Sequence, residues 1–97
     1  MGEGEKAQKK NVRPEASFAG LLLMISSTAL VHLGEVPDPI SGEKQPDLDQ
    51  AKWAVDTLGL LKEKTEGHLS AEEEGLLDEL LYDLRMRYLK ALGKMRN

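Results

Sequence analysis

The sequence predicts an all-α protein, a three-helix bundle that is completed as a homodimer. The chain has 97 residues, which is enough for one domain with a modest core. Its apolar residues recur at helical spacing in segments that proline and glycine separate. It has no cysteine, so helix packing and self-association must provide the stability that disulfides or zinc give other small domains. We expect helices at about residues 14–33, 47–66 and 70–94.

The first residues, MGEGEKAQKKNVR, are polar and of mixed charge, with no apolar residue repeated at helical or strand spacing. Such a composition is typical of a disordered segment. We therefore expect a disordered tail over residues 1–13, followed by a single helical domain over residues 14–97. The basic side chains of the tail are available to an anionic partner, but a solvated, solubilising tail is the favoured interpretation.

The run from Phe18 to Leu33 contains no charged residue, although nearly one-third of the chain is charged. On a helical wheel its large apolar side chains point in every direction, so no polar face exists. A helix of this kind is buried in a protein core or in a membrane. Pro14 suits the first turn of the helix, and Gly34 suits the left-handed residue that ends it.

A membrane span is the main alternative for this run, and a cleaved export signal is another. A span needs about 20 mostly apolar residues, and this run is shorter, with polar side chains in its second half. Basic residues precede it, as in a signal peptide, but Glu15 stands directly before its apolar part. We favour burial within a soluble, cytoplasmic protein, with a membrane-associated or exported protein as the alternative.

Three prolines and two glycines lie in residues 34–46, so this segment cannot continue a helix. Connectors of this length are uncommon in compact domains and often functional. Packing of its apolar residues Val36 and Ile40 onto the bundle is the favoured interpretation. Whether the connector is a binding surface or only structural stays open at this point.

The second and third helices both begin with capping signals. Asp47 precedes the second, with Gln50 three residues later, and Ser70 with Glu73 forms a capping box at the third. The second helix ends before Gly67. Acidic residues at the start of the third helix and basic residues at its end complement the helix dipole.

Each of these two helices also has more apolar surface than one packing face requires. Trp53 and Leu60, which are seven positions apart, extend the face of the second helix on its far side. Tyr82, Met86 and Leu89 form a second stripe on the third helix. We expect the surplus to be covered by another subunit or by a partner protein. The candidate interface residues are Leu23, Ile25, Trp53, Leu60, Tyr82, Met86 and Leu89.

The sequence offers little catalytic chemistry. Nucleophilic catalysis needs a nucleophile beside an oriented base, and the only histidines, His32 and His68, have no partner at a recognisable spacing. We expect a protein that is not an enzyme, with no cofactor and no metal site. A net charge of −4 argues against the electropositive surface that nucleic acids require, so nucleic-acid binding is the weakest alternative.

The stretch from Ser17 to Tyr88 resembles the bacterial family called domain of unknown function 1844. The resemblance rests on SSTALVHLGEVPDP, a turn at Gly42, LDQAKWAVDTLGLLKEKTEGHL and EEEGLLDELLYDLRMRY. It implies a small, helical, bacterial protein and supplies no catalytic residues. In that family asparagine usually stands where this chain has His68, which argues further against a chemical role for this histidine.

Overall fold

The structure is a computed structural model that describes residues 15–96. Within this range it contains three helices and no strand, namely α2 (Phe18–His32), α3 (Leu48–Lys64) and α4 (Ala71–Arg96). The all-α, three-helix prediction is confirmed. The disordered tail expected for residues 1–13 lies outside the described residues, as does Pro14.

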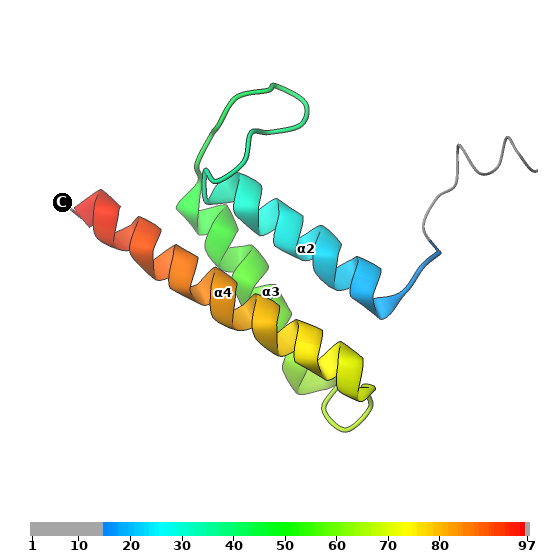
Figure 1. The fold of residues 1–97 in the computed structure, drawn as a ribbon. Helices are drawn as coiled ribbons and strands as arrows, with labels where there is room; N and C mark the ends of the chain where they lie inside the picture. The colour runs from blue at the N-terminus through cyan, green and yellow to red at the C-terminus, as the bar shows by residue number, and fades with distance from the viewer. Residues whose placement is uncertain (1–14, 97) are drawn as a thin grey trace, which may run out of the picture.

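Each helix contacts the other two, and the chain reverses direction at each connection. Helices α2 and α3 run antiparallel, α3 and α4 run antiparallel, and α4 therefore runs in the same direction as α2 (Figure 1). The last turns of α4 extend beyond the other two helices at one end of the bundle. The loop between α2 and α3 stands out from the same end.

Ser17 fixes the start of α2 at Phe18, so the helix does not begin at residue 14 as expected. The backbone of Ser17 is extended, and its Oγ accepts a hydrogen bond of 2.9 Å from the Gly20 amide. A serine side chain at this position satisfies one of the free amides of the first turn, which favours a helix start here.

Gly34 ends α2, as the sequence predicts. Its φ is 79°, and the Gly34 amide donates to the Val31 carbonyl over 3.0 Å. The next amide, that of Glu35, donates to the Leu30 carbonyl over 3.0 Å. These two bonds form a Schellman motif, which satisfies carbonyls that the helix end would otherwise leave free.

The predicted caps of the other helices are also present. Asp47 Oδ1 accepts from the Gln50 amide over 3.2 Å at the start of α3. At α4 both bonds of the capping box form, because the Ser70 amide donates to Glu73 Oε1 over 2.9 Å and the Glu73 amide donates to Ser70 Oγ over 3.1 Å. Helix α3 ends at Lys64, slightly before the expected residue 66.

One core joins the three helices. Its buried apolar side chains are Leu22, Ala29, Leu33, Ala51, Ala54, Val55, Leu58, Leu77, Leu81 and Leu84. The buried alanines belong to α2 and α3, the pair of helices with the most extensive mutual contact. Small side chains let two helix backbones approach closely, which agrees with the extensive contact between α2 and α3.

Only one face of α2 is buried, although the helix is apolar on every side. Leu22, Ser26, Ala29 and Leu33 form that face. The hydroxyl of Ser26 donates to the Leu22 carbonyl over 2.8 Å, so it is satisfied inside the core. The two other helices therefore do not surround α2, and its opposite face stays open.

Asp38 organises the loop over residues 34–46. Its Oδ1 accepts from the amides of Ile40 and Ser41, over 2.7 and 3.2 Å respectively. This Asx turn leaves Ile40 94% exposed, so Ile40 does not pack onto the bundle as expected. The ends of the loop are close together, because the Asp47 amide donates to the His32 carbonyl over 2.8 Å.

Replacing Gly34 with alanine should lower the free energy of unfolding by about 1–2 kcal/mol. A Cβ at this residue would sit in the left-handed region and 3.0 Å from Cγ of Pro46. The matched control is Gly75→Ala on α4, where a Cβ meets no heavy atom within 4 Å. We expect that control to gain about 0.5–1 kcal/mol in a urea titration. Equal effects at both sites would contradict the capping role of Gly34.

Candidate interaction surface

The open face of α2 is the most unusual part of the surface. Leu23 is 50% exposed and Met24 is 61% exposed, with Leu21 exposed beside them. No acidic or basic residue other than His32 occurs between Phe18 and His32.

The polar side chains of this face do not make it hydrophilic. The Thr28 hydroxyl donates to the Met24 carbonyl over 3.2 Å, so it is bonded to the helix itself. Two further exposed residues of α2, Gly20 and Ser27, are small. The result is a continuous uncharged helix face with low relief at its centre.

A second apolar group lies on α3. Trp53 is 64% exposed, and Leu60 is exposed two turns further along the same side of the helix. Thr57 lies between them in sequence, and its hydroxyl donates to the Trp53 carbonyl over 2.7 Å. This hydroxyl too is bonded to its own helix.

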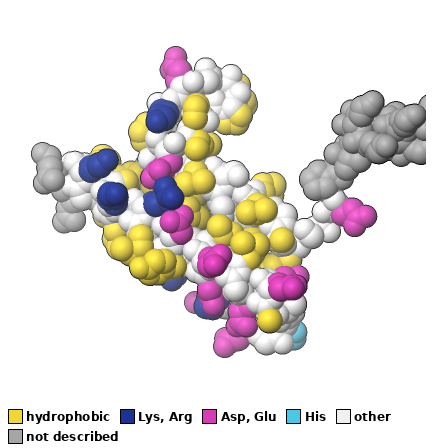
Figure 2. All heavy atoms as spheres, viewed as in Figure 1, with side chains coloured by type: hydrophobic (Ala, Val, Ile, Leu, Met, Phe, Trp, Pro, Cys, Tyr) yellow, Lys and Arg dark blue, Asp and Glu magenta, His cyan; other side chains and the backbone are white. Residues whose placement is uncertain are grey.

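The third group, which we call the α4 stripe, consists of Tyr82, Met86 and Leu89. Tyr82 is 70% exposed, and the other two are also exposed. The spacing of four and then three residues places them on one side of α4. The buried side of the same helix is marked by Leu77, Leu81 and Leu84. In Figure 2 hydrophobic side chains gather along the lower edge of α4 and between the helices.

Six of the seven candidate interface residues are therefore exposed, and Ile25 differs from them. Ile25 is half-buried and packs against the core, so it belongs to the fold rather than to the open face of α2. Sequence reasoning did not select Leu21, Met24 or Ile40, all of which are exposed. A helix that is apolar on every side gives no signal that tells which side is covered.

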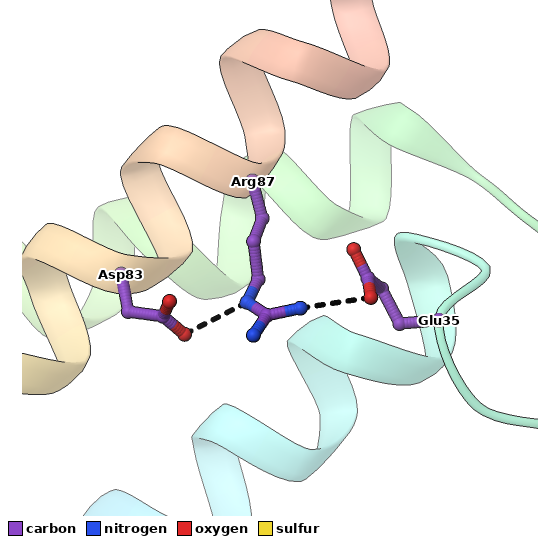
Figure 3. Close-up of polar contacts among 3 residues, drawn as sticks. All are labelled: Glu35, Asp83 and Arg87. Carbon is purple, nitrogen blue, oxygen red and sulfur yellow. Dashed lines mark hydrogen bonds and ion pairs between the residues drawn. The ribbon is translucent and has the colours of Figure 1, made fainter.

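Arg87 connects α4 to the end of α2 (Figure 3). Its Nε donates to Asp83 Oδ2 and its Nη1 donates to Glu35 Oε1, each over 2.8 Å. The hydrogen bond that Arg87 donates to Asp83, followed by the charges of both carboxylates, raises the pKa of the Arg87 guanidinium above its ordinary value. Asp83 lies four residues before Arg87 on the same side of α4, while Glu35 is brought to Arg87 only by the fold. All three side chains are partly exposed, so the two ion pairs of Arg87 contribute little to the free energy of unfolding.

A hollow of about 420 Å³ lies where α3 turns into α4. Its charged lining is mixed, with Lys62, Glu63, Glu66, Glu74 and Arg85. The hydroxyl in its wall, that of Thr65, already donates to the Leu61 carbonyl over 2.7 Å. No nucleophile paired with an oriented base lines this hollow, so it offers no recognisable reaction centre.

The two histidines lie near the ends of helices. His32 is the last residue of α2, and His68 lies in the turn between α3 and α4. Within residues 15–96, no group of three or more histidine, aspartate or glutamate side chains is placed to hold a metal ion. In the same part of the chain, no helix has both the length and the apolar character that crossing a bilayer requires.

The comparison with known families matches the residues that form the bundle. A family model described as "Domain of unknown function (DUF1844)" matches residues 15–90, which include all of α2 and α3 and most of α4. No curated protein and no solved structure matches the chain. The resemblance seen in the sequence is confirmed at the level of the family.

Proposed function

The chain belongs to the DUF1844 family, whose function is unknown, and we propose that it is a non-catalytic helical module that acts by binding protein surfaces, including a second copy of itself. The observation that carries this proposal is the open face of α2. An exposed helix face without any charged residue is uncommon on a soluble monomer and marks an interaction site.

The size of the effect supports association. Complete burial of a large apolar side chain stabilises by about 1.5–3 kcal/mol. Leu23 and Met24 are at least half exposed in the bundle, so a partner that covers them would add part of this stabilisation. Trp53 adds an aromatic side chain of the kind that anchors interfaces. Together these three side chains present more apolar surface for burial than the single exposed leucines that are normal on protein surfaces.

The partner surface that suits α2 is the apolar face of another helix. Gly20 and Ser27 are seven residues apart and exposed on α2, so the centre of the face is low and lets a helix approach closely. Leu23 and Met24 stand on either side of this strip and would pack against the flanks of the incoming helix. A charged partner surface would lose its hydration against this face without finding a counter-charge.

Capture from the source cells with the purified 97-residue chain tests this proposal. We expect a protein to be retained by the wild type and lost by the double variant Leu23→Lys with Met24→Lys. The matched control is Gln45→Lys with Gln50→Lys, which adds the same charge at two other exposed positions. Circular dichroism should show that all three proteins are folded.

Two outcomes would overturn the proposal. One is retention of the same proteins by both double variants, because the open face of α2 would then not be the contact. The other is binding of the wild type, but not of the α2 variant, to vesicles of anionic phospholipid with no protein retained. That result would assign the face to a lipid surface.

A further inference from the structure

We infer that two copies of this chain associate through the α4 stripe, with their α4 helices antiparallel and a two-fold axis near Met86. This inference deepens the proposed function and rests on its self-association. It assigns the α4 stripe to the second copy and so leaves the open face of α2 for a different protein.

The stripe has the geometry of a helix-pairing seam. Tyr82, Met86, Leu89 and Gly93 follow one another at intervals of four, three and four residues, which is the spacing of a two-helix contact. All four are exposed, and Gly93 has open space where a Cβ would be. The seam faces away from the buried residues of α4, so the bundle does not need to open for a second copy to reach it.

Charge is completely segregated along α4. From Ala71 to Leu84 the helix has six acidic residues and no basic one, while from Arg85 to Arg96 it has five basic residues and no acidic one. Figure 2 shows acidic side chains gathered mostly around the start of α4 and basic ones toward its end. The helix dipole explains such a preference only within the first and last turns. The segregation extends to the middle of the helix, where Asp83 and Arg85 meet.

The apolar stripe is centred on this boundary between the two charges. If a second α4 lies antiparallel across Met86, the acidic half of each copy faces the basic half of the other. A parallel arrangement would place like charges opposite each other and is disfavoured for that reason. Glu79 and Lys90 are eleven residues apart and therefore on the same flank of the seam. The antiparallel arrangement brings Glu79 of one copy within about one helical turn of Lys90 of the other.

A hollow beside the stripe fits this arrangement. It has a volume of about 240 Å³, lies between α3 and α4, and is lined by Lys52, Val55, Asp56, Arg85, Tyr88 and Leu89. With the axis near Met86, Tyr82 of one copy lies within about one residue of the level of Leu89 of the other copy, at the wall of this hollow. An aromatic side chain that enters a largely apolar hollow is the usual anchor of a protein interface.

Cysteine cross-linking tests the orientation cleanly, because the natural chain has no cysteine. Met86→Cys should form a disulfide-linked dimer with itself, since this residue is at the axis. Gly93→Cys alone should not, because two copies of residue 93 would be about 21 Å apart along the helices. A mixture of Gly93→Cys with Glu79→Cys should form a mixed dimer, and Trp53→Cys serves as a control on another face.

Charge reversal tests the same contact without a covalent cross-link, through the dissociation constant of the dimer. Glu79→Lys and Lys90→Glu should each weaken the dimer about tenfold, because each places like charges across the interface twice. The double variant should recover the wild-type dissociation constant to within about threefold. Tyr82→Ala should weaken the dimer more than tenfold, and Tyr82→Phe should have little effect.

The possible failures can be told apart. A dimer that persists unchanged in Met86→Asp, with no cross-link at residue 86, would overturn the α4 contact and leave self-association in place. Efficient self-linking of Gly93→Cys would overturn the antiparallel orientation. A wild-type chain that stays monomeric at 100 µM would overturn self-association altogether. This outcome needs a measurement on the wild type, because cross-linking of the cysteine variants does not show it.

Discussion

Replacing Leu22 with alanine is expected to lower the free energy of unfolding by about 3 kcal/mol. Leu22 is fully buried, and truncation would leave a cavity where the three helices meet. The adjacent residue Leu23 is half exposed, so Leu23→Ala should cost less than about 1 kcal/mol in the same helix. Urea unfolding at low protein concentration measures both.

This pair of variants tests which side of α2 is buried. A sequence without a polar face permits either side, and only the contacts of the bundle decide between them. A greater loss for Leu23→Ala than for Leu22→Ala would show that α2 is rotated from the orientation described above. The effect on association should be the reverse, with Leu23 mattering more than Leu22 for the binding of a partner.

Replacing Ala54 with leucine is expected to cost about 2–3 kcal/mol, because the larger side chain has no space in the core. Ala54 is fully buried, and the buried alanines of α2 and α3 set the close approach of these helices. Trp53, its neighbour, is mostly exposed, so Trp53→Leu should change the stability by less than about 1 kcal/mol. Thermal unfolding compared with the wild type provides the measurement.

The expected loss of stability in Ala54→Leu comes from the close approach of α2 and α3 at this residue. A leucine at residue 54 would either push α2 away from α3 or take up a strained conformation. Both would weaken the packing of Ala29 and Leu58, which belong to the same core. A free energy of unfolding for Ala54→Leu equal to that of the wild type would contradict close packing of α2 against α3 at this residue.

Local signals were predictable from the sequence because neighbouring residues produce them. The cap at Asp47, the capping box of Ser70 with Glu73, and the terminating Gly34 each depend on hydrogen bonds within a few positions. The start of α2 was wrong for a local reason too. Ser17 accepts from the amide of Gly20 and stops the helix there, although Pro14 is also compatible with a first turn.

Features that depend on distant parts of the chain could not be predicted in this way. The pairing of Glu35 with Arg87 joins residues 52 positions apart and follows from the parallel placement of α2 and α4. The exposure of Ile40 is different, because its cause is local: the Asp38 side chain, two positions away, accepts from the Ile40 amide in an Asx turn. The half-buried position of Ile25 follows from the rotation of α2, which a helix without a polar face does not specify.

For the candidate interface, the sequence predicted surplus apolar surface on α3 and α4, and the structure shows that surface exposed. Trp53 and Leu60 lie on one side of α3, and the α4 stripe lies on one side of α4. The patterns were readable because each helix also has an unmistakable buried face, which fixes the remaining stripe as outward. What covers the stripes depends on a second molecule, so their role as an interface stays a prediction.

The central claim is that this surface is covered by association, and the mass of the full chain in solution tests it most directly. Sedimentation equilibrium between 1 and 100 µM should show a rise from the monomer mass of 10.7 kDa toward twice that value, 2 × 10.7 = 21.4 kDa. The α4 variant Met86→Asp should remain at 10.7 kDa over the same range while keeping its helical circular dichroism spectrum. A wild-type mass of 10.7 kDa at every concentration would contradict the account.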